Sequence, residues 1–164
     1  MDKKYISVLV KNHEGVLARL SSLFCQRGFN IDSLNVSATN DSSLSRVTIT
    51  TSGSEEEIEQ IIKQTKKLEE YVGIFELEPK DSLIRELLII KIAQDAGNRS
   101  SLLELATIYN AKIIDISVGS IVFELAGKPA KIDSFIENLK IYDIMEMCRT
   151  GVTAIQRGNV KLVK

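Results

Sequence analysis

The stretch Val10-Lys-Asn-His-Glu-Gly-Val-Leu-Ala-Arg-Leu20 joins an extended apolar segment to a helix through a short polar loop. Before the loop, Ile6, Val8 and Val10 alternate with other residues, as in a strand with one buried face. From Val16 onward the apolar residues follow helical spacing. Glycine at position 15 lets the backbone approach a ligand, and the first turn of a helix offers N–H groups to an anion. The stretch therefore predicts a strand, a loop and a helix that together can bind a small carboxylate.

The rest of the first half extends this unit to the order strand, helix, strand, strand, helix, strand. Gly28 stands where a left-handed residue is expected to end the first helix. Ser54 and Glu57 have the spacing of a capping box, which predicts the start of the second helix. Alternation and turn-forming residues predict three further strands, over residues 31–38, 44–51 and 72–78.

The second half repeats that order without obvious sequence identity, after a linker that we expect at residues 79–82. Ser101 and Glu104 have the spacing of another capping box, and Pro129 suits the first turn of the last helix. Four strands are expected in this half, over residues 86–93, 111–118, 121–126 and 144–149.

Two βαββαβ units therefore predict an α+β fold of two ferredoxin-like domains, at residues 1–78 and 83–164. Each domain should be an antiparallel sheet with helices on one face. The opposite face would be bare unless another domain or subunit covers it. Because such small units bury little surface alone, we expect at least a dimer.

The composition is that of a globular protein without a strong charge bias. Of the 164 residues, 44% are hydrophobic and 26% are charged, which argues against a disordered chain. The net charge of −1 argues against broad binding to nucleic acid or to anionic membranes. No window approaches about 18 uninterrupted apolar residues, and the N-terminus lacks the apolar core of a signal peptide. We expect a cytoplasmic protein, with Cys25 and Cys148 as free, buried thiols.

Enzymatic chemistry has little support in the sequence. His13 is the single histidine, so a His-rich metal site and a Ser–His–Asp arrangement with a spare base are excluded. Neither GxxxxGK[ST] nor GxGxxG occurs, and residues 55–57 are acidic because carboxylates favour the first turn of a helix. Arg99 either holds an anion before a helix or serves as an entry or interface residue. Arg149 and Arg157 are structural or face a partner, and the sequence leaves these alternatives open.

The loop after the first strand is the strongest candidate for a ligand site, with a simple turn and helix cap as the alternative. Its backbone N–H groups at residues 15–17 can receive a carboxylate, and an asparagine side chain offers both a donor and an acceptor. The segment that enters the second strand should add polar and apolar groups at the same end of the sheet. An aliphatic α-amino acid would suit such a site. The candidate residues are Asn12, Gly15, Val16, Leu17, Asn30 and Ile31.

Three motifs together resemble an ACT domain, namely Asn12-x-x-Gly15-Val-Leu, Arg27-Gly-Phe-Asn-Ile31 and Leu44-Ser-Arg-Val-Thr-Ile49. Over nearly its full length the chain resembles the family of small regulatory subunits of acetolactate synthase, also called acetohydroxyacid synthase. Three later segments are similar to the C-terminal domain of that family, namely Glu86-Leu-Leu-Ile-Ile-Lys91, Ala111-Lys-Ile-Ile-Asp115 and Arg149-Thr-Gly-Val152. Glu14 departs from the Pro or Ser that other members often carry, which affects the rigidity of the loop more than the class of ligand.

The resemblance implies a non-catalytic subunit that binds and activates a large catalytic subunit in the biosynthesis of valine, leucine and isoleucine. It also implies feedback inhibition by a branched-chain amino acid, typically valine, held between the ACT domains of a homodimer. By that analogy Asn12, Gly15, Val16 and Leu17 of one chain would face Asn30 and Ile31 of the other.

The same resemblance implies no cofactor on this chain, because thiamine diphosphate, magnesium and FAD belong to the catalytic partner. That partner condenses two pyruvates, or pyruvate with 2-oxobutanoate. One alternative is a stand-alone amino-acid-sensing ACT regulator of transcription or signalling, but no basic helix-turn-helix segment is evident. Another is a small ferredoxin-like enzyme, which would need acid–base groups that the sequence does not offer.

Overall fold

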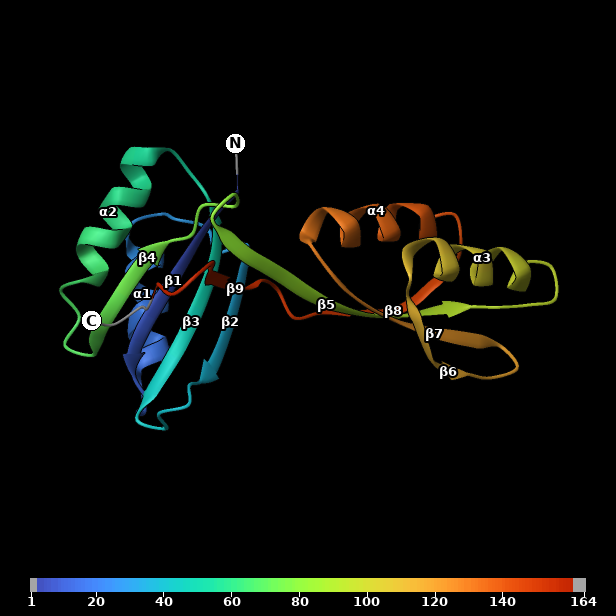
Figure 1. The fold of residues 1–164 in the computed structure, drawn as a ribbon, viewed down its shortest axis with the longest axis horizontal. Coiled ribbons are helices and arrows are strands. Elements are labelled where there is room, and N and C mark those ends of the chain that lie inside the picture. The colour runs from blue at the N-terminus through green and yellow to red at the C-terminus, as the bar shows by residue number, and fades with distance from the viewer. Residues whose placement is uncertain (1–2, 161–164) are drawn as a thin grey trace. The chain divides into compact units, whose positions relative to one another are not determined.

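The chain folds as two compact units, which the computed structural model describes over residues 3–160. The first unit contains residues up to 84 together with the segment from residue 151, and the second contains residues 85–150. Each unit is an antiparallel sheet with two helices on one face (Figure 1). This confirms the predicted α+β class of two ferredoxin-like domains, while the expected ends at residues 1–2 and 161–164 lie outside the described part.

The first unit has the predicted order of strands and helices. Its sheet has the strand order β2-β3-β1-β4, and all neighbouring strands are antiparallel. Its elements are β1 (Lys3–Lys11), α1 (Val16–Gln26), β2 (Ser33–Ala38), β3 (Leu44–Ser52), α2 (Glu55–Thr65) and β4 (Tyr71–Glu76).

The core of the first unit lies between this sheet and its two helices. The face of β1 predicted to be buried is confirmed, because Ile6, Val8 and Val10 are almost fully buried. The other face is not exposed as the alternation suggested, since Ser7 and Leu9 are buried as well. The side chains on the predicted face pack against Leu20 and Phe24 of α1 in one apolar cluster. Burial of these apolar side chains supplies most of the driving force that holds the helices on the sheet.

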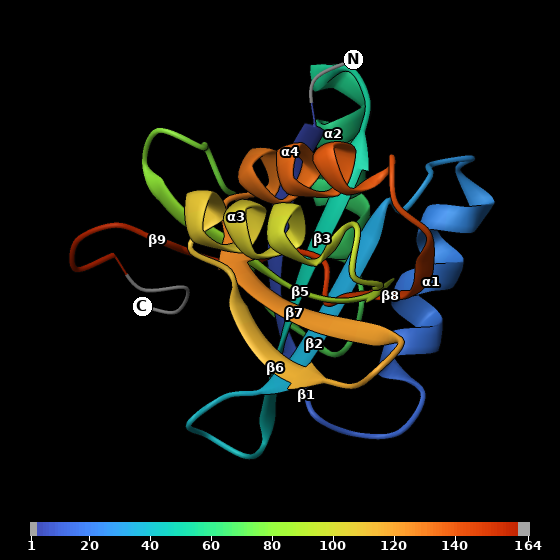
Figure 2. The same ribbon diagram turned by 90° about the vertical axis from the view of Figure 1, so that its right-hand side faces the viewer.

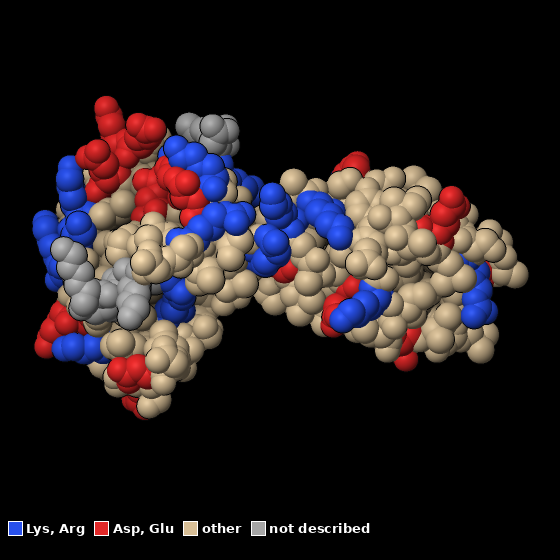
Figure 3. Space-filling view, viewed as in Figure 1, with Lys and Arg blue, Asp and Glu red and all other residues tan. Residues whose placement is uncertain are grey.

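Local signals place the start of α2 and the end of α1 in the first unit. The capping box of α2 is present, since the Ser54 N–H donates to Glu57 Oε2 at 2.7 Å and the Glu57 N–H donates to Ser54 Oγ at 3.3 Å. Gly28, just after α1, is left-handed with φ of 71°. Side chains in the first turn of α2 gather into an acidic patch in Figure 3. These carboxylates lie at the positive end of the helix dipole, as predicted.

The second unit repeats the topology of the first. Its sheet has the order β6-β7-β5-β8, and Figure 2 shows α3 and α4 together on one face of that sheet. The core between them includes the buried side chains of Leu88, Phe123 and Phe135. The elements are β5 (Ser82–Ala93), α3 (Arg99–Tyr109), β6 (Lys112–Ile116), β7 (Ser120–Gly127), α4 (Pro129–Leu139) and β8 (Ile144–Arg149).

The predicted capping box before α3 is wrong. The helix begins at Arg99, two residues before Ser101, and no side chain caps it. An Asp95 turn starts it instead, because Asp95 Oδ1 accepts from the N–H groups of Gly97 and Asn98 at 2.8 and 2.9 Å. Because the helix already begins at Arg99, Ser101 lies within its first turn and is not at the N-cap position that a capping box requires.

The described segment from residue 151 to residue 160 belongs to the first unit rather than to the expected domain 83–164. A last strand, β9 (Thr153–Gln156), pairs with β5, whose first residues also lie in the first unit. Val152 and Ala154 are buried beside apolar residues on the sheet face opposite α1 and α2. Part of the face that was expected to be bare is therefore covered by the protein's own C-terminal segment. The apolar residues in contact are Tyr5, Phe75, Leu77 and Ile84.

Both cysteines are free thiols, as predicted, but their predicted burial is wrong. Cys25 follows the buried Phe24 on α1, so it falls on the exposed side of that helix. Cys148 pairs with Ile89 on the sheet face opposite α3 and α4, where the helices do not cover it.

Candidate functional site

The polar loop between β1 and α1 is fixed at one end of the first sheet. The Lys11 N–H donates to the backbone oxygen of Glu70 at 2.9 Å, and the Asn12 N–H donates to that of Ser43 at 2.7 Å. Gly15 is the N-cap of α1 and is left-handed with φ of 84°. An added Cβ at Gly15 would meet no atom within 4 Å. The first turn of α1 is therefore open to a ligand that approaches past Gly15.

The side chains of this loop differ in what they can offer to a ligand. The Asn12 Nδ2 group donates to the Ser42 backbone oxygen at 2.9 Å, which orients the side chain. Its Oδ1 atom accepts no hydrogen bond from any residue in the described range, so it can receive one from a ligand ammonium. Val16 is buried in the core and offers only its N–H, whereas Leu17 is 42% exposed and offers apolar surface. We call Asn12, Gly15, Val16 and Leu17 the loop half-site.

Asn30 and Ile31 lie at the opposite end of the sheet, so the expectation that they share one end with the loop is wrong. Strands β1 and β2 are both antiparallel to β3 and therefore run parallel to each other. Lys11 pairs with Leu44 at one end of β3, whereas Thr51 Oγ1, near the other end, donates to the backbone oxygen of Asn30 at 2.6 Å. The 11 residues of α1 separate the two ends by roughly 16 Å.

These two residues form a second exposed patch, which we call the strand half-site. Asn30 is exposed, and its Nδ2 atom donates to Asp32 Oδ1 at 2.8 Å. Ile31 is half-buried and packs against the core of the first unit. Each half-site carries a neutral polar side chain beside apolar surface. Within one chain, however, the two half-sites cannot contact the same small molecule.

A buried carboxylate beside the loop half-site escaped sequence analysis. Glu70 is only 2% exposed, and its carboxylate forms an ion pair with Arg19 of α1. His13 in the loop has its Nε2 atom 4.0 Å from the same carboxylate. The three residues link the loop, α1 and the turn before β4, and so fix where α1 begins. A glutamate in a charged turn gives no sequence signal of burial, since its neighbours Glu69 and Lys67 look equally solvated.

The three arginines left open by the sequence are now placed. Arg149 is structural, because it forms an ion pair with the buried Glu86 and its Nη1 atom donates to Asp133 Oδ1 at 2.8 Å. Burial opposes its charge, but these bonds outweigh burial and raise the pKa of Arg149. Arg99 is the exposed first residue of α3, and the Arg157 N–H donates to a backbone oxygen in the turn before β5.

Within residues 3–160, neither a metal site nor a membrane-spanning helix is found. Residues 3–160 contain no group of three His, Cys, Asp or Glu side chains placed to hold a metal ion. No helix in that range is long and apolar enough to cross a membrane.

Comparisons with known proteins connect both units to one family. A family model for the acetohydroxyacid synthase small subunit-like ACT domain matches residues 6–72, and a model for the small subunit of acetolactate synthase matches residues 85–158. The acetolactate synthase small subunit of Mycolicibacterium smegmatis is 42% identical over 153 residues, which cover 93% of this chain and 90% of that protein. A probable acetolactate synthase small subunit of Archaeoglobus fulgidus is 42% identical over 159 residues, which cover 97% and 99%.

A solved structure agrees with these sequence matches. The crystal structure of the acetolactate synthase small subunit from Thermotoga maritima aligns with a TM-score of 0.90 at 35% identity. The alignment covers 98% of this chain and all of that one. Fold and sequence therefore point to the same family over both units.

Proposed function

Because the chain belongs to the acetolactate synthase small-subunit family, we propose that it binds and activates a large catalytic subunit and confers inhibition by valine. Family membership gives the chain a regulatory role in branched-chain amino acid synthesis. In this proposal the chain supplies no catalytic group. Thiamine diphosphate, magnesium and FAD are bound by the catalytic subunit.

The separation of the two half-sites is the observation that carries the proposed valine site. Strand β2 is at the edge of its sheet, with β3 as its partner among the described strands. An edge strand offers unpaired N–H and C=O groups to a second copy of itself. Antiparallel pairing of two β2 strands across a two-fold axis would bring Asn30 of one chain to the loop end of the other. The loop half-site of each protomer would then face the strand half-site of its partner, giving two identical sites per dimer.

Each part of valine has a matching group in such a shared site. The carboxylate would accept from the N–H groups at residues 15–17, where the helix dipole favours negative charge. The ammonium would donate to the Oδ1 atom of Asn12 or Asn30. The branched side chain would lie on Leu17 and Ile31, which are the partly exposed apolar residues of the two half-sites.

Regulation follows because the site exists only between two chains. Valine would favour the dimer arrangement in which both half-sites close on it, and an effector shifts a conformational equilibrium by its difference in affinity for the two states. A coupling free energy of about 1–3 kcal/mol is typical of such systems. The catalytic subunit would be held differently in the closed state, and its activity would fall.

Reconstitution tests this function. The purified chain is added to a thiamine-dependent acetolactate synthase catalytic subunit, and acetolactate formation is measured with and without valine. We expect activity to rise with the added chain and to fall again with valine, whereas the catalytic subunit alone should not respond to valine. A catalytic subunit that is indifferent to the chain would refute the proposal. It would also favour a stand-alone amino-acid-sensing regulator.

A further inference from the structure

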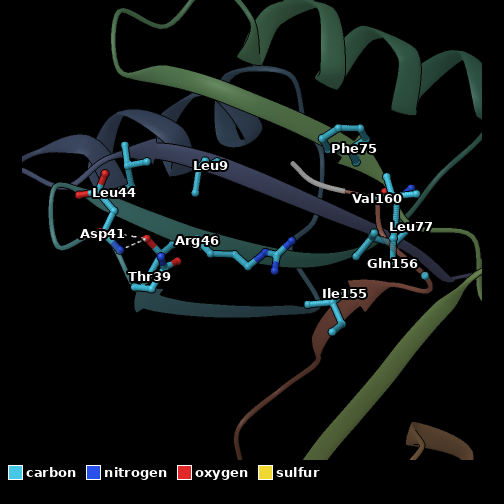
Figure 4. A pocket seen from close by; sticks show the side chains of 12 residues that line it. Leu9, Thr39, Asp41, Leu44, Arg46, Phe75, Leu77, Ile155, Gln156 and Val160 are labelled. Atoms are coloured by element: carbon cyan, nitrogen blue, oxygen red, sulfur yellow. Dashed lines mark hydrogen bonds between the residues drawn. The ribbon is translucent and has the colours of Figure 1, made fainter. Parts of the chain in front are cut away.

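A cavity of about 600 Å³ lies on the face of the first sheet opposite α1 and α2 (Figure 4). The strand register places the cavity on this face. Leu9 pairs with Arg46, while the flanking Val8 and Val10 point into the core on the other face, which the helices cover. Cavities of this size commonly hold small organic ligands. Its apolar walls are formed by Leu9, Leu44, Phe75, Leu77, Ile155 and Val160.

Arg46 supplies the positive charge of this cavity. Its Nε atom donates to Oγ of the fully buried Ser7 at 3.0 Å, which fixes the plane of the guanidinium. In Figure 4 the side chain runs along the cavity away from Asp41 and toward Ile155. Burial lowers the pKa of Arg46 from its usual value. Among residues 3–160 no carboxylate forms an ion pair with it, so no described residue supplies a direct counter-charge to this half-buried guanidinium.

The guanidinium nitrogen atoms of Arg46 that are not bonded to Ser7 favour a carboxylate as the ligand. With Nε already bonded to Ser7, the two terminal nitrogen atoms remain, and together they match the two oxygens of a carboxylate. An anion that enters the cavity would also offset the cost of leaving Arg46 half-buried and unpaired.

The rim of the cavity argues for a ligand with a single negative charge. Asp41 lies on the rim and accepts from the N–H and Oγ groups of Ser43 at 2.9 and 2.6 Å. These bonds lower the pKa of Asp41 and so keep it ionised. A second negative charge on the ligand would be repelled there, which disfavours phosphates and dicarboxylates.

We propose that this cavity is a second small-molecule site, which binds an organic monocarboxylate with an apolar body through Arg46. No residue of either half-site lines it, so this binding is separate from that of valine. One wall is formed by Ile155 and Val160 of the C-terminal segment, so a bound ligand also holds that segment on the sheet.

Titration of the full chain with 4-methylpentanoate tests this site, with the uncharged 4-methylpentanamide as the matched probe. We expect saturable binding of the acid and binding of the amide weaker by at least about tenfold, since charge-assisted hydrogen bonds are the strong ones. Arg46→Gln should weaken binding of the acid by a similar factor. Arg99→Gln, which removes an exposed guanidinium in the second unit, should leave it unchanged.

Two further variants keep the test independent of folding and of the valine site. Ile155→Glu changes a half-exposed residue of β9 and brings a carboxylate to Arg46, so it should compete with the acid without altering Arg46 itself. Gly15→Asp should leave binding of the acid unchanged. Hydrogen exchange should show that the acid protects the amides of β9 in the wild-type chain.

Several results would overturn the proposal. Absence of saturable binding would do so, as would equal binding of the acid and the amide or full affinity in Arg46→Gln. Loss of binding in Gly15→Asp would assign the acid to the valine site instead. If the acid does not bind and Arg46→Gln weakens only the association with the catalytic subunit, the cavity is a protein contact and the proposal is wrong.

Discussion

Replacement of Gly15 by aspartate separates backbone strain from electrostatics at the proposed valine site. Gly15 has φ of 84°, a left-handed conformation that costs most residues with a Cβ atom about 1–2 kcal/mol and costs aspartate and asparagine less. No steric cost adds to this, since an added Cβ meets nothing within 4 Å. Gly15→Asn introduces the same strain, because asparagine has the size of aspartate without its charge. Both variants should therefore unfold at similar, slightly lowered denaturant concentrations.

The charge sets the difference between the two variants in valine binding. A carboxylate at position 15 would lie about 5 Å from the valine carboxylate, and at an effective dielectric constant of about 20 the repulsion is about 3 kcal/mol. That free energy corresponds to a loss of affinity of more than about 100-fold. Gly15→Asp should therefore bind valine at least about 100-fold more weakly than Gly15→Asn.

Calorimetric titration with valine measures this difference directly, on samples whose folding is checked by denaturant unfolding. Activation of the catalytic subunit provides a second readout, and it should persist in Gly15→Asp because it does not require the valine site. If the two variants bind valine equally well, the carboxylate of valine does not lie at the beginning of α1, and the reasoning fails.

Three further predictions concern one ligand contact and two structural features. Asn12→Ala should weaken valine binding by about 1–3 kcal/mol in calorimetry, and unchanged affinity would remove Asn12 from the site. Ser54→Ala should lower the free energy of unfolding by about 1 kcal/mol, because it removes the α2 cap; an unchanged denaturation midpoint would contradict this. Gly151→Ala should destabilise the chain more than Gly158→Ala, by about 1–3 kcal/mol. Both glycines have φ of 73°, but an added Cβ at Gly151 would come within 2.8 Å of Ser33 Cβ, whereas one at Gly158 meets nothing within 4 Å. Equal free energies of unfolding for the two alanine variants would refute this packing.

Local features of the fold could be predicted because their causes are local. The alternation of Ile6, Val8 and Val10 indicates which face of β1 packs against the helices, although Ser7 and Leu9 on the other face are also buried. The Ser54 capping box and the left-handed Gly28 act within a few residues of the helix ends that they specify. The capping box expected at Ser101 is absent for an equally local reason. The Asp95 turn starts the helix two residues earlier, at Arg99.

Features that depend on strand order could not be predicted in this way. Periodicity shows which face of a strand is buried, but it does not show which ends of two strands are neighbours. Asn30 lies far from the loop half-site because β1 and β2, both antiparallel to β3, run in the same direction, so the start of β2 and the end of β1 lie at opposite ends of the sheet. Burial of Glu70 and the position of Arg46 in a cavity likewise depend on contacts between distant parts of the sequence.

A hybrid dimer tests the central claim, that each valine site is shared between two chains. Gly15→Asp chains and Asn30→Lys chains carry different affinity tags, are mixed, and are purified as hybrids. Each variant alone should bind valine very weakly, because Asn30→Lys removes an acceptor and places a cation beside the valine ammonium. In the hybrid one site would combine both defects, and the other would combine the intact loop half-site of one chain with the intact strand half-site of the other. We predict one valine per hybrid dimer, bound with wild-type affinity. Hybrids that bind no valine would show that each site lies within a single chain and would contradict the account.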